Sequence, residues 1–113
     1  ISGRADDMLV IRGVNVFPTQ IEEVLLKINE IGPHYEILVE RKNRLDVMTI
    51  TVELVDDRLL DSYAQLSELE LRIKKALKAQ LGLATQIRLV APNSLKRFEG
   101  KARRVTDLRK DGL

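Results

Sequence analysis

The chain has 113 residues, 44% hydrophobic and 32% charged, which is typical of one soluble globular domain. It has no cysteine and one histidine, which excludes disulfides and thiol nucleophiles and argues against a histidine-based metal site or catalytic triad. The net charge of +2 is too small to indicate nucleic acid, and no apolar run approaches the roughly 18 residues of a membrane-spanning helix.

The first eighteen residues form a pattern that is unusual for a chain start. A charged segment, 4–7, leads into two short β-prone runs, 8–11 and 14–17, which Gly13 separates. This spacing predicts a small hairpin whose glycine allows a positive φ or the close approach of a ligand. Because the chain begins inside this pattern, at Ile1 and without a methionine, we expect it to be a piece of a longer protein.

Two stretches carry the three- and four-residue spacing of amphipathic helices. The first begins with a predicted capping box between Thr19 and Glu22. Its apolar face holds Ile21, Val24, Leu25 and Ile28. The second spans 62–81, and Gly82 is expected to end it as a C-cap.

Three stretches alternate apolar and polar residues with the period of two that indicates a strand: 35–41, 46–54 and 86–90. The first two are expected to pair as an antiparallel hairpin. A short final helix is predicted over 101–108.

The order of these elements predicts an α+β fold. Two main helices would cover one face of a small, mostly antiparallel three-stranded sheet. A single domain is expected, with its core in 21–90. The hinge and hairpin of 1–18 and the tail of 91–113 would then be appendages.

Basic side chains gather near the C-terminus: Lys96, Arg97, Lys101, Arg103, Arg104, Arg109 and Lys110. A solvated tail explains this composition, and a site for phosphate or carboxylate is the sharper hypothesis. RNA binding is less well supported, because Phe98 is the only aromatic residue there. Lys101 follows Gly100 on a predicted loop, and its long side chain is suited to reaching into a site that other parts of the protein form.

Acidic pairs and the histidine are weaker candidates. Asp6–Asp7 lacks further oxygen ligands for a metal and more often caps a turn, and Glu22–Glu23 favours a helix N-terminus. His34 reads as a loop or strand-edge residue. The residues therefore predict no metal site and no complete active site within this chain.

Both ends resemble motifs of a known enzyme superfamily. Residues 3–7, with 11–15 and 21–23, resemble the hinge motif of the adenylate-forming enzymes, and 94–107 resembles their C-terminal lysine motif. Within that superfamily, 6–18, 33–35 and 104–109 are similar to the phenylacetate–CoA ligase family. The resemblance covers essentially the whole chain.

The resemblance implies a mobile C-terminal domain of a cytoplasmic, AMP-forming aryl-acid–CoA ligase, inactive by itself. A larger N-terminal domain would be its partner and would bind most of the ATP, Mg²⁺ and aryl acid. The acid would react with ATP to give an acyl-adenylate, and CoA would then displace AMP. Nucleic acid and membrane are not expected as partners, and a homodimer stays open.

Roles follow from the resemblance position by position. Lys101 matches the adenylation lysine, Asp6 matches the hinge residue, and Arg4 matches an arginine near the nucleotide. The matching hairpin lines the pantetheine tunnel for CoA and comprises Arg12, Gly13, Val14 and Asn15.

The chain departs from the family pattern at Lys96 and Phe98, where proline and a small hydroxyl residue are usual. This affects the loop conformation and any hydroxyl contact to phosphate.

The sequence leaves two alternative functions open: a free-standing α+β regulatory or ligand-binding module, and a domain of a related enzyme that adenylylates a deazaflavin without using CoA. The sequence identifies neither the acid nor the acceptor.

Overall fold

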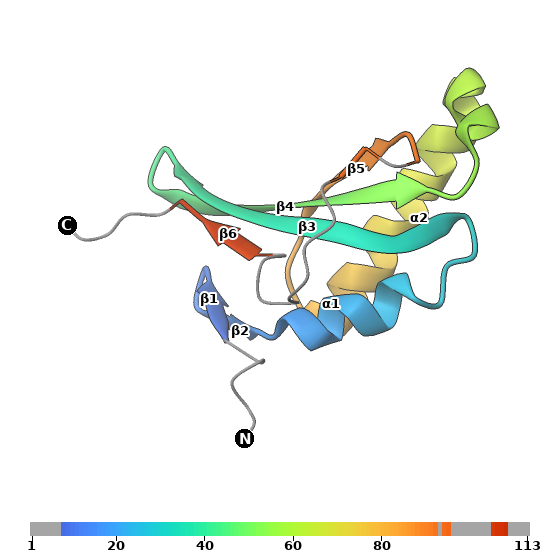
Figure 1. Cartoon of the computed structure of the whole chain (residues 1–113). Coiled ribbons are helices and arrows are strands. Elements are labelled where there is room, and N and C mark those ends of the chain that lie inside the picture. Colours follow the sequence, from blue (N-terminus) through green and yellow to red (C-terminus); the bar gives the residue numbers. More distant parts are fainter. Residues whose placement is uncertain (1–7, 93, 96–104, 109–113) are drawn as a thin grey trace.

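The computed structural model describes residues 8–92, 94–95 and 105–108 (Figure 1). The first described elements are the strands β1 (Leu9–Ile11) and β2 (Val14–Val16), followed by the helix α1 (Pro18–Leu25). The middle consists of β3 (Ile31–Lys42), β4 (Leu45–Leu54), the 3-10 helix η2 (Asp57–Asp61) and α2 (Tyr63–Leu81). The last described elements are β5 (Gln86–Val90) and β6 (Val105–Asp107).

The main sheet has four strands in the order β5-β4-β3-β6 and is mixed. β3 and β4 form the predicted antiparallel hairpin, whereas β5 runs parallel to β4 and β6 parallel to β3. The α+β class is confirmed, but the mostly antiparallel three-stranded sheet is wrong. The reason is that α2 carries the chain back across the sheet, so that β5 starts in the same direction as β4.

Helix α2 buries one stripe against the sheet, and Gly82 ends it as the sequence predicts, whereas Ser62, expected to lie within the helix, is its N-cap. The buried residues are Leu69, Ile73, Leu77 and Leu81. The Ser62 hydroxyl accepts a hydrogen bond from the Gln65 amide, and Gly82 closes the helix with a φ of 85°.

Helix α1 starts earlier than predicted, and the Thr19–Glu22 capping box is wrong. Phe17 is the N-cap, and its amide donates to the Gln20 side chain at 2.9 Å. Pro18 has a fixed φ that suits the first helical turn, which explains the earlier start.

Arg72 of α2 donates a hydrogen bond to Glu30, just before β3, at 2.8 Å, and this hydrogen bond lowers the pKa of the Glu30 carboxyl.

The β1–β2 hairpin belongs to the core, so its interpretation as an appendage is wrong. Ile11 and Val16 are fully buried in the same cluster as the stripe of α2 and the inner residues of β3 and β4. In Figure 1 the hairpin lies on the same side of the main sheet as α1 and α2. A hairpin of two three-residue strands is marginal alone, so this burial is what holds it in place.

The C-terminal end adds an edge strand where a helix over 101–108 was expected. Residues 105–107 pair with 37–39 of β3, and the Leu108 amide donates to the Val39 carbonyl at 2.8 Å. Three residues are too few for a strand period to be recognised in sequence, which explains the error. The rest of the predicted helix, 101–104, lies outside the described residues.

Two leucines of α2 provide a matched test of this packing. Leu77 is fully buried, and Leu71 is 52% exposed on the same helix. We expect Leu77→Ala to reduce the free energy of unfolding by about 2–5 kcal/mol, because it leaves a cavity. Leu71→Ala should change it by less than about 0.5 kcal/mol. Urea unfolding of the two variants measures the difference, and equal losses would contradict the packing described.

Candidate functional site

The turn between β1 and β2 places Arg12 and Gly13 at the surface. Both residues have positive φ, 53° and 78°, as in the two-residue turns that match the twist of a hairpin. The predicted hairpin around Gly13 is confirmed. A Cβ built on Gly13 would meet nothing within 4 Å, so the backbone conformation, and not crowding inside the domain, favours glycine here.

Asp46 holds this turn against the start of β4. One oxygen of its carboxylate accepts a hydrogen bond from the Arg12 amide at 3.4 Å, and its backbone carbonyl accepts from Arg12 Nε at 2.9 Å. The other carboxylate oxygen accepts from Arg41 Nε at 3.0 Å. The Asp46 side chain is only 12% exposed. One partly buried carboxylate therefore contacts both the β1–β2 turn and the end of β3.

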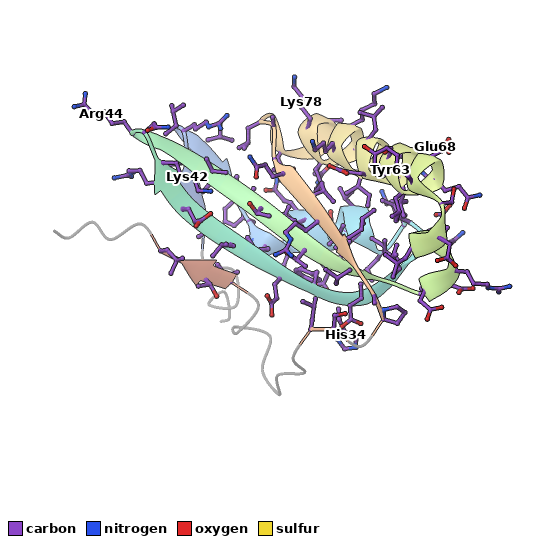
Figure 2. All side chains as sticks on the ribbon, turned by 90° about the horizontal axis from the view of Figure 1, so that it is seen from above. His34, Lys42, Arg44, Tyr63, Glu68 and Lys78 are labelled. Atoms are coloured by element: carbon purple, nitrogen blue, oxygen red, sulfur yellow. The ribbon has the colours of Figure 1, made fainter. Side chains whose placement is uncertain are left out.

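A second tight turn brings another arginine to the same end of the sheet. Asn43 and Arg44 join β3 to β4 with φ values of 52° and 69°. Figure 2 shows Arg44 at the tip of this hairpin, at the opposite end from His34. A surface hollow of about 440 Å³ lies here. It is lined by Arg12, Arg41, Arg44, Leu45 and Asp46.

A smaller hollow of about 150 Å³ lies on another side of Arg12. Its lining includes Met48, Thr85 and Gln86. Thr85 is 7% exposed, and its hydroxyl oxygen has no hydrogen-bond partner in the part of the chain that the structure describes. A buried hydroxyl usually has a partner, so this hollow offers an unused polar group to a water or a ligand.

The structure brings together only some of the residues singled out from sequence. Arg12, Gly13 and Asn15 are exposed around the β1–β2 turn, and Val14 is half-buried against the core. Arg4, Asp6 and Lys101 lie outside the described residues, as do Lys96 and Phe98. His34 is a half-buried residue of β3.

The described ranges contain neither a metal-binding cluster nor a membrane-spanning helix. No group of three or more His, Cys, Asp or Glu residues there could hold a metal ion. None of the described helices has the length and apolar character needed to cross a membrane.

Sequence reasoning missed Arg41, Arg44 and Asp46. It expected 35–41 and 46–54 to pair as a hairpin and assigned no function to the residues at the turn between them. The available signal was the cluster of arginines flanking that turn, but nothing local linked it to Arg12, which is 34 positions from Asp46.

Residues 13–109 match the family described as "AMP-binding enzyme C-terminal domain". The chain is 43% identical over 109 residues to the phenylacetate–coenzyme A ligase of Escherichia coli, covering 96% of this chain and 25% of that protein. It is 47% identical over 110 residues to the phenylacetate–coenzyme A ligase of Pseudomonas putida, again covering 96% and 25%. The chain thus spans about a quarter of the length of these curated relatives.

Solved structures agree with the sequence relatives. A domain of phenylacetate–coenzyme A ligase from Bacteroides vulgatus superposes with a TM-score of 0.83 at 39% identity, covering 96% of this chain and 98% of that one. A 2-hydroxyisobutyryl-CoA ligase in complex with 2-HIB-AMP and CoA, in the thioesterification state, has a TM-score of 0.82 at 33% identity. That match covers 93% of this chain and 22% of the ligase.

Removal of the Asp46 carboxylate tests how the turn is held. In Asp46→Ala we expect the β1–β2 amides to exchange their hydrogens about fivefold to tenfold faster, because a lost hydrogen bond contributes about 1 kcal/mol net. Amides of α2 should be unaffected. Hydrogen exchange followed by NMR makes the measurement.

Asp56→Ala is the matched control. Asp56 lies beyond the other end of β4, where a hydrogen bond from Arg58 lowers the pKa of its carboxyl. Faster exchange of the β1–β2 amides in both variants would argue against a specific role of Asp46.

Proposed function

Since the chain belongs to the family of AMP-binding enzyme C-terminal domains, we propose that it is the mobile domain of an AMP-forming ligase that joins a phenylacetate-like aryl acid to CoA. The observation that carries this proposal is the identity of 43–47% to phenylacetate–CoA ligases over 96% of the chain. The complete enzyme would include a large N-terminal domain that binds most of the ATP, Mg²⁺ and acid.

The proposed reaction has two halves. A carboxylate oxygen of the acid attacks the α-phosphorus of ATP, and pyrophosphate leaves, which gives the acyl-adenylate. The sulfur of CoA then attacks the acyl carbon as its thiol proton is lost, and AMP leaves with the bonding electrons. This domain would turn about Asp6 between the two steps and present a different surface in each.

Lys101 and Arg4 would serve the first half. In this proposal Lys101 enters the site and stabilises the negative charge that develops on the carboxylate and phosphate oxygens. Arg4 would lie near the ribose and phosphate of the nucleotide. The hairpin of Arg12, Gly13, Val14 and Asn15 would face the pantetheine arm of CoA in the second half. Gly13 is exposed and lacks a side chain, which supports this role because another molecule can approach the backbone closely there.

The role of Lys101 predicts a split between the half-reactions of the full-length enzyme. In Lys101→Ala, release of pyrophosphate should fall by about 10²–10³-fold, the effect of losing one charge-stabilising group. Conversion of supplied acyl-adenylate to thioester should continue at the normal rate. Lys78→Ala, at the exposed end of α2 labelled in Figure 2, is the control and should change neither step. Survival of both half-reactions in Lys101→Ala would refute this role.

The role of Gly13 predicts the opposite split. Gly13→Leu should slow thioester formation by at least about tenfold relative to adenylation, because the side chain enters the proposed tunnel and Leu disfavours a positive φ. Gly82→Leu is matched in backbone geometry, with a φ of 85° and open space around the Cβ position. It should lower stability while leaving the ratio of the two steps unchanged. An equal loss of both steps in Gly13→Leu would count against the tunnel assignment.

The same full-length assay separates the proposal from a ligase that does not use CoA. An enzyme that forms the adenylate of an aryl acid but transfers nothing to CoA would show that the acceptor is a different molecule.

A further inference from the structure

We propose that Arg12, Arg41 and Arg44 form a binding site for a phosphate group in the nucleotide half of CoA. This inference rests on the proposed function, because it assigns the ligand through the thioester-forming step. The site would lie in the 440 Å³ hollow beside the β1–β2 turn. The described lining of this hollow does not include Gly13, the glycine that would line the tunnel.

The first observation is the convergence of three arginines from separate parts of the chain. Arg12 comes from the β1–β2 turn, Arg41 from the end of β3 and Arg44 from the β3–β4 turn. All three line one hollow together with Leu45 and Asp46. Among the described residues of that lining Asp46 is the only acidic one and three are arginines, so the described lining carries a net positive charge. Such a charge attracts an anion.

The second observation is the way in which these guanidinium groups are already bonded. Arg12 and Arg41 each donate from Nε to Asp46, and the described residues offer no partner to their outer nitrogens. Arg44 has no hydrogen bond or ion pair with any described residue. Asp46 therefore orients two arginines and leaves their forked ends available. That fork matches a phosphate group, to which it donates two parallel hydrogen bonds.

The third observation is backbone strain at two of the three arginines. Arg12 and Arg44 both have positive φ, 53° and 69°. This conformation is unfavourable for a non-glycine residue, and asparagine or glycine is preferred in such turns. Two separate turns thus carry arginine where a smaller residue would fold more easily. Strain of this kind concentrates at functional sites, and here it presents two guanidinium groups to one hollow.

The position of the hollow selects CoA over ATP. Arg12 lines the hollow and is also the neighbour of Gly13 in the hairpin that would face the pantetheine arm. A molecule whose thin arm passes Gly13 would bring its charged nucleotide half to the surface nearby. That half carries a 3′-phosphate and a pyrophosphate, and the pantetheine portion carries no charge.

The test compares two acceptors in the full-length enzyme, CoA and pantetheine, of which the second lacks every phosphate. In the double variant Arg41→Gln/Arg44→Gln we expect the KM for CoA to rise by about 10–100-fold, since two charge-assisted hydrogen-bonding groups are lost. The kcat with CoA, the KM for pantetheine and the rate of pyrophosphate release should stay unchanged. Arg58→Gln, at the far end of β4, is the control.

Dephospho-CoA identifies the phosphate concerned. If the wild-type enzyme binds it as weakly as the double variant binds CoA, the 3′-phosphate occupies the site. If the variant still discriminates against dephospho-CoA as strongly as the wild type does, the pyrophosphate occupies it. Equal changes in KM for CoA and pantetheine, or no change in either, would overturn the inference.

Direct binding separates failure of this inference from failure of the proposed function. Adenosine 3′,5′-bisphosphate is the probe, measured by calorimetry on the full-length protein. Weaker binding to the double variant than to the wild type would support the anion site even if the enzyme made no thioester. Equal binding, or none to either protein, would overturn the site even if thioester formation were normal.

Discussion

Asp46 makes the contact on which the candidate site depends. Its carboxylate and its carbonyl both bond to Arg12, and the same carboxylate bonds to Arg41. This contact orients the exposed tip of a hairpin whose base is already held by buried side chains. Asp46 is the second residue of the ten-residue strand β4, which belongs to the most extensively paired part of the molecule. Its hydrogen bonds therefore fix the β1–β2 turn to that part of the sheet.

The hydrophobic core also holds the hairpin, through the buried residues on either side of the turn. Ile11 and Val16 flank the turn and are fully buried with residues of α2 and β4. The hairpin therefore cannot shift without opening the core. In the proposed function, a rotation of the domain would carry Gly13 and the three arginines as one rigid unit. Such rigidity suits a domain that must place its residues accurately against a site on another domain, because positioning errors near 1 Å reduce catalysis strongly.

Membership of the family does not identify the acid substrate. The 2-hydroxyisobutyryl-CoA ligase has the same domain at 33% identity, although the acid in its name differs from phenylacetate. Peptide-synthetase adenylation structures at 14–17% identity share the fold alone. In the proposed function, this domain would serve adenylation and transfer. Selection of the acid would belong to the rest of the enzyme.

The sequence by itself determined the elements whose signal is local. The long helix with its glycine cap, the antiparallel pair 35–41 and 46–54, and the hairpin around Gly13 all follow from periods and turn residues. Only the tertiary structure decided the parallel edges of the sheet and the burial of the first hairpin. It also decided the meeting of Arg12 with Asp46, 34 positions apart. Contacts between distant residues leave no repeating pattern in the chain, so chemistry that depends on them becomes visible only when the chain is folded.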